Sequence, residues 1–124
     1  FVKVKVSGAD TYASAKIVSK SIANSPLVKT AISGEDPNWG RIIMAIGKSG
    51  EKINRDRITV KFGKILVAEN GWVAPSYSEE LGASYMKNDE LEINVDLGVG
   101  NQSATFYTCD FSHDYISINA DYRS

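Results

Sequence analysis

The sequence has 124 residues, of which 43% are hydrophobic and 23% are charged, ordinary proportions for a globular domain that buries a core. Fourteen basic and fifteen acidic residues give a formal net charge of −1, which argues against a nucleic-acid or anionic-membrane partner. No apolar run has the length of a membrane span, so we expect no membrane association. The single cysteine, Cys109, excludes an internal disulfide and fits a reducing compartment such as the cytoplasm.

The first residues already follow a strand pattern, in which three valines alternate with Lys3 and Lys5. The sequence begins at Phe1 inside this pattern and not at a methionine, so we expect a fragment or a processed product of a longer chain. Ser7 and Gly8 then end the strand. With no repeat, linker or low-complexity stretch, residues 1–124 are expected to form a single domain.

A helix is expected after this strand, with Asp10 or Thr11 as its N-cap and its end before Pro26. Its buried face carries Ala15, Val18 and Ile22. From Leu27 to Ile32 the chain is short, apolar and β-branched near its end, which predicts a buried strand.

Residues 34–37 then predict a turn that opens a second helix, with Asp36 as N-cap and Pro37 at the first helical position. The apolar stripe of this helix is formed by Trp39, Ile42, Ile43 and Ile46.

The second half of the sequence is dominated by strand patterns and one helix. Asn70 and Gly71 predict a tight hairpin, and a capping box from Ser76 to Glu79 predicts a helix to about Lys87. Strands are expected at residues 58–62, 65–68, 72–73, 91–97, 104–111 and 115–120. This order of elements predicts an α/β or α+β fold, a layered domain with a mixed β-sheet and flanking helices.

Few residues qualify as candidates for chemistry. Cys109 and His113 could form a nucleophilic pair, but a buried structural thiol is the favoured interpretation of Cys109. His113 is the only histidine, so no metal site is expected. The adjacent carboxylates Glu35 and Asp36 suit either a site or, as we favour, the capping of the following helix.

The C-terminal tail is the other candidate. Strand alternation predicts that Ile116 and Ile118 lie on one face and Tyr115, Ser117 and Asn119 on the other. Asn119 also lies close in sequence to the small, polar C-terminal residue Ser124. An asparagine in this position could bind the amide, ammonium or carboxylate of a small molecule. Fraying of the terminus is the alternative that the pattern leaves open.

Several long blocks resemble one enzyme family in the correct order. They are Asn24–Ile32 (Asn-Ser-Pro-Leu-Val-Lys-Thr-Ala-Ile), Gly34–Arg41 (Gly-Glu-Asp-Pro-Asn-Trp-Gly-Arg), Thr108–Asp110 (Thr-Cys-Asp) and Ile118–Ser124 (Ile-Asn-Ala-Asp-Tyr-Arg-Ser). The chain resembles, over essentially its whole length, the C-terminal part of the β chain of the bifunctional ornithine acetyltransferase/N-acetylglutamate synthase family of arginine biosynthesis.

This resemblance implies a precursor that cuts itself into α and β chains, which assemble as α2β2 in the cytoplasm. The new N-terminal threonine of the β chain would take acetyl from N-acetylornithine, or from acetyl-CoA in bifunctional members, and pass it to glutamate. The fold implied is an α/β/β/α sandwich resembling N-terminal-nucleophile enzymes. No cofactor is implied, since acetyl-CoA would be a substrate.

The resemblance also implies what this chain lacks. The threonine nucleophile and the oxyanion-hole residues of the family lie upstream of the position that matches Phe1, so no catalytic residue is expected among these 124. A substrate-contacting glutamate of the family lies just before that position, so Glu35 does not inherit its role. Two tail residues do match family positions that contact substrate: Asn119 and Ser124, the latter replacing a threonine of many members and keeping the hydroxyl.

Two alternatives remain open at this point. A small domain with this order of elements could be a non-enzymatic interaction or RNA-binding module, although the near-neutral charge argues against RNA. It could also belong to a relative from secondary metabolism with the same chemistry and another acceptor.

Overall fold

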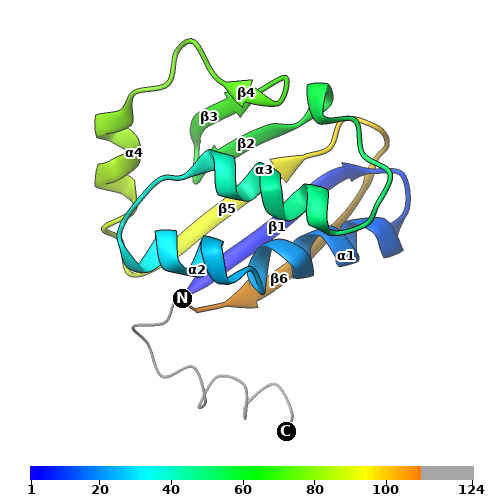
Figure 1. The fold of residues 1–124 in the computed structure, drawn as a ribbon, viewed down its shortest axis with the longest axis horizontal. Helices are drawn as coiled ribbons and strands as arrows, with labels where there is room; N and C mark the ends of the chain where they lie inside the picture. The colour runs from blue at the N-terminus through cyan, green and yellow to red at the C-terminus, as the bar shows by residue number, and fades with distance from the viewer. Residues whose placement is uncertain (110–124) are drawn as a thin grey trace, which may run out of the picture.

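A computed structural model describes residues 1–109 (Figure 1). Along the chain the elements are β1 (Val2–Ala9), α1 (Tyr12–Ala23), α2 (Pro26–Ser33), α3 (Trp39–Lys48), the 3₁₀ turn η1 (Arg55–Arg57), β2 (Thr59–Phe62), β3 (Ile65–Glu69), β4 (Trp72–Val73), α4 (Glu79–Tyr85), β5 (Leu91–Asp96) and β6 (Gln102–Thr108). This arrangement confirms the predicted α+β class.

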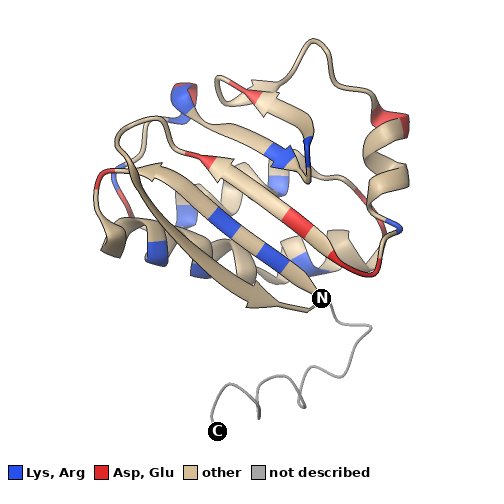
Figure 2. Cartoon of the chain, turned by 180° about the vertical axis from the view of Figure 1, so that it is seen from behind, with Lys and Arg blue, Asp and Glu red and all other residues tan. Residues whose placement is uncertain are grey.

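Within the described residues the strands form one mixed sheet in the order β4-β3-β2-β5-β1-β6. β1 and β5 are parallel neighbours, with Val2 opposite Leu91, whereas every other pairing is antiparallel. Helices α1, α2 and α3 cover one face of the sheet, and α4 lies beside its β3 side (Figure 1). The opposite face carries no described helix (Figure 2).

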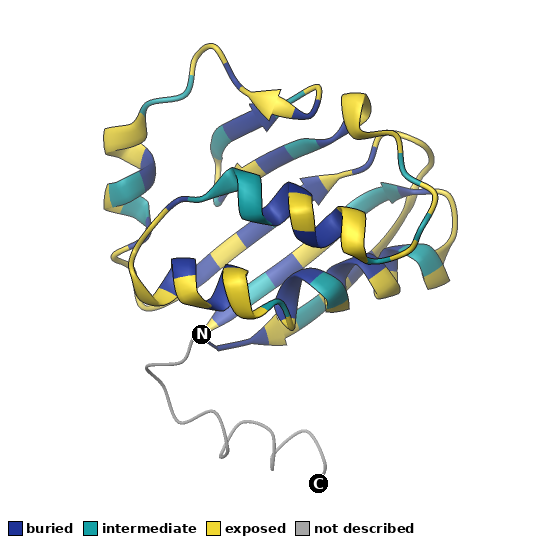
Figure 3. Cartoon of the chain, in the orientation of Figure 1, coloured by how far each residue is buried: buried dark blue, intermediate teal, exposed yellow. Residues whose placement is uncertain are grey.

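The core lies between the sheet and the three helices. Alternate residues of the central strands point into it, because successive side chains of a strand face opposite sides. Its members from the sheet include Val2, Val4, Val6, Val60, Phe62, Ile93 and Val95, each at most 2% exposed. Figure 3 shows this pattern as buried bands along the strands. The strand predictions made from alternation are therefore confirmed for β1, β2 and β5.

The predicted strand from Leu27 to Ile32 is wrong, because this segment is helix α2. Ser25 is its N-cap, and its hydroxyl accepts a hydrogen bond of 3.3 Å from the Val28 N–H. Pro26 occupies the first helical turn, where its missing N–H costs nothing, so the proline that ends α1 also begins α2. The buried residues of α2 follow helical periodicity: Val28, Lys29, Ala31 and Ile32.

The predicted cap of α3 is also misplaced. Asn38, and not Asp36, is the N-cap, and its Oδ1 accepts a hydrogen bond of 3.0 Å from the Arg41 N–H. Asp36 supports the cap from outside the helix, since its Oδ2 accepts a hydrogen bond of 3.1 Å from Asn38 Nδ2. The apolar stripe is confirmed, with Ile42, Ile43 and Ile46 buried and Trp39 packed against the core.

Local turn chemistry explains the remaining boundaries. Thr11 caps α1, as one of its two predicted candidates. The N-cap of α4 is Ser78 and not Ser76, because the Ser78 hydroxyl accepts from the Leu81 N–H at 3.3 Å. The predicted hairpin is present, with Asn70 and Gly71 both at positive φ. The strand expected at residues 115–120 lies outside the described residues.

Candidate functional site at one end of the sheet

Three strand ends meet where β1 begins. Register places Val2 opposite Leu91 of β5 on one side and opposite Thr108 of β6 on the other. The Phe1 ring packs on the Tyr107 ring at 5.5 Å between centroids. This end of the sheet therefore carries the first residue of the chain and Cys109, to which residues 110–124 are attached.

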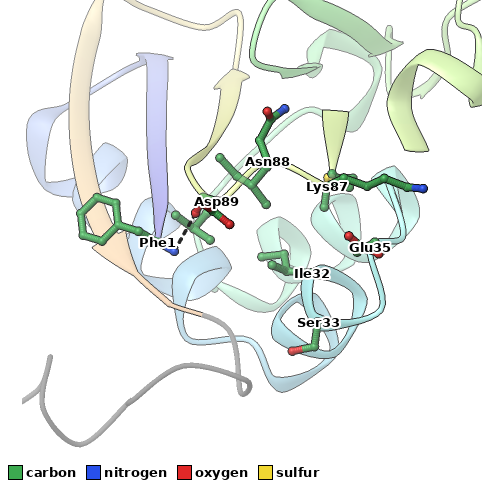
Figure 4. A pocket seen from close by; sticks show the side chains of 10 residues that line it. Phe1, Ile32, Ser33, Glu35, Lys87, Asn88 and Asp89 are labelled. Atoms are coloured by element: carbon green, nitrogen blue, oxygen red, sulfur yellow. Dashed lines mark hydrogen bonds between the residues drawn. The ribbon is translucent and has the colours of Figure 1, made fainter. Parts of the chain in front are cut away.

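A pocket of about 270 Å³ opens beside Phe1 (Figure 4). Its floor is apolar and comes from β1, α2, β5 and the residue after α4: Val2, Ile32, Leu91 and Met86. Its rim is polar and exposed, with Ser33 at the end of α2 and Glu35 just after it facing the turn that precedes β5. That turn contributes Lys87, Asn88 and Asp89.

Two features fix the backbone of the rim. The Phe1 nitrogen donates to the Asp89 carbonyl at 3.2 Å, and the Leu91 N–H donates to the Phe1 carbonyl at 3.0 Å. Glu35 has a φ of 54°, a left-handed conformation that costs a residue with a side chain roughly 1–2 kcal/mol. Strained residues of this kind are concentrated at functional sites, so the Glu35 conformation marks this rim as a candidate site.

The chemistry of the rim suits recognition better than bond breaking. It offers carboxylates, an ammonium, an amide and a hydroxyl around an apolar floor, a combination that matches a small zwitterion such as an amino acid. No histidine occurs among the described residues to activate Ser33 as a nucleophile. Within the same part of the chain, no group of three or more His, Cys, Asp or Glu side chains is placed to hold a metal ion.

The predicted site residues divide into three groups. Asn119, Ser124 and His113 lie outside the described residues, and the substrate-binding role of the first two stays a prediction. Cys109 is buried, at 1% exposure, in agreement with a structural thiol. Glu35 does not cap α3, contrary to our interpretation of the sequence, but lies on the pocket rim four residues before that helix begins.

Sequence reasoning missed Lys87, Asn88 and Asp89. A polar run between a helix and a strand is ordinary turn composition, and no local signal separates it from a binding loop. Only the parallel pairing of β1 with β5 brings this turn beside Phe1.

Comparison with known proteins gives a consistent result. The sequence model of the ArgJ family matches residues 1–124. The chain belongs to the ArgJ family.

Individual relatives agree with the family match. The chain is 60% identical over 124 residues to the "Arginine biosynthesis bifunctional protein ArgJ" of Ruegeria pomeroyi, covering 100% of the chain and 30% of that protein. It is 54% identical over 123 residues to the protein of that name from Brucella suis, covering 99% of the chain and 30% of the relative. The chain thus spans about 30% of the length of these curated relatives.

A solved structure supports the fold. The chain superimposes on the crystal structure of the arginine biosynthesis bifunctional protein ArgJ of Bacillus halodurans with a TM-score of 0.86 and 41% identity, covering 98% of this chain and 57% of that one. Membership of a family of biosynthetic enzymes does not favour the interaction-module and RNA-binding alternatives. Within residues 1–109, no helix has the length and apolar character needed to cross a membrane.

Proposed function

We propose that this chain is the C-terminal, substrate-binding and scaffold portion of an acetyltransferase of arginine biosynthesis. The enzyme moves acetyl from N-acetylornithine, or from acetyl-CoA, to glutamate through an acetyl-threonine intermediate. The observation that carries the proposal is the ArgJ family match over residues 1–124. A relative of secondary metabolism with another acceptor is the competing proposal.

The end of the sheet supports this assignment. Residues 110–124, which include Asn119 and Ser124, follow β6 in the sequence, and Thr108 of β6 pairs with Val2, which lines the strand-end pocket. The family resemblance assigns both residues to substrate contact. The mixed-charge rim of the pocket is complementary to the ammonium and carboxylate groups that ornithine and glutamate share.

The different roles of this chain and of the upstream parts of the enzyme follow from the chemistry of acetyl transfer. The threonine hydroxyl attacks the acetyl carbonyl carbon, its proton passes through the α-amine as base, and ornithine leaves after its nitrogen is protonated. The amine of glutamate then attacks the acetyl ester and releases the threonine hydroxyl. Both the nucleophile and the oxyanion donors come from upstream parts of the enzyme, so this chain orders the substrate without reacting with it.

The surrounding assembly belongs to the same proposal. Residues 1–124 form one domain that combines with the upstream part of the β chain and with the α chain, in a cytoplasmic α2β2 enzyme. The proposal includes no cofactor, because the threonine itself carries the acetyl group between donor and acceptor. The isolated chain is therefore inactive, and measurable transfer of acetyl from N-acetylornithine to glutamate by residues 1–124 alone would contradict the proposal.

Substitution of the two tail residues tests the site. In the intact protein that contains this chain, Asn119→Ala and Ser124→Ala should each lower kcat/KM for N-acetylornithine by about tenfold or more, because each removes a hydrogen bond to a charged substrate group. Ser124→Thr keeps the hydroxyl and is the matched control, with an expected change of less than about threefold.

Acceptor choice separates the two enzyme proposals. Steady-state transfer is measured with glutamate and with a panel of other amino acids and amines. Preference for glutamate supports arginine biosynthesis, whereas transfer to another acceptor with glutamate inactive supports the secondary-metabolism relative. Unchanged kinetics of both alanine variants would remove the tail from the site in either case.

A further inference from the structure

The open face of the sheet holds a row of basic residues that none of the preceding sections uses. Register places Lys5 of β1 opposite Asn94 of β5, and Asn94 opposite Lys61 of β2. These three residues therefore lie side by side on three neighbouring strands. Since adjacent strands are separated by about 4.8 Å, the two lysine backbones lie about 10 Å apart with the asparagine between them.

A hollow of about 320 Å³ lies over this row. Its lining is more polar than apolar and comes from β1, β2, β5 and the turn after β2: Lys5, Ser7, Lys61, Gly63, Lys64 and Asn94. The volume falls in the range of small-molecule sites, roughly 300–1,000 Å³. An adjoining hollow of about 170 Å³ continues along Ser7, Thr59 and Asp96. The hollow over the lysine row shares no lining residue with the pocket beside Phe1.

The base of this hollow is built rigidly. Asn94 Nδ2 donates to the Gly63 carbonyl at 3.0 Å and so ties β5 to the turn that carries Lys64. Gly63 has a φ of +60°, and a Cβ placed there would lie 2.7 Å from the Tyr85 ring of α4. The Tyr85 hydroxyl in turn accepts from the Glu92 N–H at 2.9 Å. The second N–H of the Asn94 amide stays available to a ligand, since one N–H is used.

The charges around the hollow favour an anion. Within residues 1–109, no salt bridge joins Lys5, Lys61 or Lys64 to a carboxylate. Of the two acidic residues that β5 presents on this face, Glu92 is opposite Lys3 in the neighbouring row, and Asp96 accepts a hydrogen bond from the Gly98 N–H at 2.8 Å. Figure 2 shows the basic bands on β1 and β2 flanking β5.

We propose that this hollow, which we name the lysine-row site after Lys5, Lys61 and Lys64, binds the oligophosphate group of a small molecule. Three flexible lysine side chains line the hollow, and the Asn94 amide, held by its hydrogen bond to Gly63, adds a directed donor. A phosphate chain is the occupant that matches, because it spreads several acceptor oxygens and more than one negative charge over a length comparable to the separation of the two lysine strands. The site does not depend on the acetyltransferase proposal.

Calorimetric titration of the intact protein with inorganic pyrophosphate tests this site. We expect saturable binding that weakens as salt is raised, since exposed charges are screened. Lys5→Gln and Lys61→Gln should each weaken binding about tenfold, by removing a charge-assisted hydrogen bond. Lys3→Gln is the matched control, because Lys3 lies on the same face of β1 but outside the hollow, and its affinity should stay within about twofold.

Further titrations distinguish a nucleotide-linked ligand from a simple oligophosphate, and they can refute the proposed site. Coenzyme A binding more tightly than pyrophosphate, with the same dependence on Lys5 and Lys61, would support a nucleotide-linked ligand, whereas equal affinity would support a simple oligophosphate. Citrate binding as tightly as pyrophosphate would refute selectivity for phosphate. Absence of binding by both phosphate probes, or equal weakening by Lys3→Gln, would refute the site. Unchanged melting temperatures show that the variants are folded.

Discussion

The N-cap of α3 gives the sharpest test of the structure against the sequence pattern. The sequence alone predicts Asp36 as the cap, whereas Asn38 Oδ1 accepts the Arg41 N–H at 3.0 Å. Replacement of a capping asparagine by alanine costs about 1 kcal/mol. Asn38→Ala should therefore lower the free energy of unfolding by about 1 kcal/mol, which corresponds to roughly 4 °C in melting temperature for a domain of this size.

Asp36→Ala should cost much less. Its carboxylate makes one exposed hydrogen bond, to Asn38 Nδ2 at 3.1 Å, and the loss of such a bond is worth about 0.5 kcal/mol or less. Asn38→Ser separates the two contributions, because serine caps as well as asparagine but has no amide to donate to Asp36. The serine variant should thus resemble Asp36→Ala and not Asn38→Ala.

Urea unfolding followed by circular dichroism measures all three variants. Midpoints should shift while the slope of unfolding free energy against urea stays constant, which shows that stability alone has changed. If Asp36→Ala cost as much as Asn38→Ala, the helix would begin at Pro37 as the sequence pattern predicts, and the boundary of α3 described above would be wrong.

Four further substitutions test backbone and side-chain strain. Gly63→Ala combines a left-handed φ with a Cβ 2.7 Å from the Tyr85 ring and should destabilise by about 2 kcal/mol or more in urea unfolding. Tyr77→Phe should leave stability unchanged or raised, because the Tyr77 hydroxyl is buried with no hydrogen-bond partner among the described residues. Glu35→Gly should raise stability by about 1 kcal/mol and, in the intact protein, lower the acetyl transfer proposed above, whereas Asn70→Gly, at the same φ of 54°, should raise stability alone.

The Tyr77 variant also has a pH signature. Burial, with the nearby Glu79 carboxylate, raises the pKa of Tyr77 to about 12 from its usual value near 10. The unfolded state then releases this proton at lower pH than the folded state, so stability falls as pH rises from 10 to about 12. Tyr77→Phe should make the fall shallower. Tyr12→Phe, at an exposed position, should follow the unsubstituted protein, and identical slopes for all three proteins would contradict the burial argument.

A helical glycine controls for the loss of flexibility in Gly63→Ala. A Cβ at Gly47 of α3 meets nothing within 4 Å, and alanine is the better helix former. Gly47→Ala should therefore stabilise by about 0.5 kcal/mol. Stabilisation by Gly47→Ala together with destabilisation by Gly63→Ala would attribute the effect to local geometry, whereas destabilisation at both positions would contradict it.

Alternation predicted the strands well because their burial is one-sided. The side chains of β5 point alternately into the core and away from it, with a strict period of two, and those that point into the core are buried. The segment from Leu27 to Ile32 offered no such periodicity, since a short apolar run suits a buried strand or a helix equally. Ser25 and Pro26 decide between the two, because serine as N-cap followed by proline in the first turn favours a helix. From the sequence alone, the proline is interpreted only as the end of α1.

Strand order could not be predicted from the sequence pattern. β1 and β5 are separated by more than eighty residues, and their parallel pairing depends on how three helices fold back over the sheet. Both hollows depend on that pairing, because it brings Asp89 beside Phe1 and Asn94 beside Lys5. The tail residues Asn119 and Ser124 were found by family resemblance, which strand alternation by itself could not supply.

The connection between α2 and α3 is determined both by local turn chemistry and by its position beside the pocket. It satisfies the end of α2, where Gly34 N–H donates to Thr30 at 3.0 Å and Asp36 N–H donates to Ala31 at 2.8 Å, and it begins α3 at the Asn38 cap. So short a connection must reverse the chain quickly, and Glu35 makes this turn at positive φ. A glycine would do so with less strain, so the cost of glutamate calls for a function of its side chain. Its position on the rim beside Phe1 fits the amino-acid recognition proposed above for this pocket.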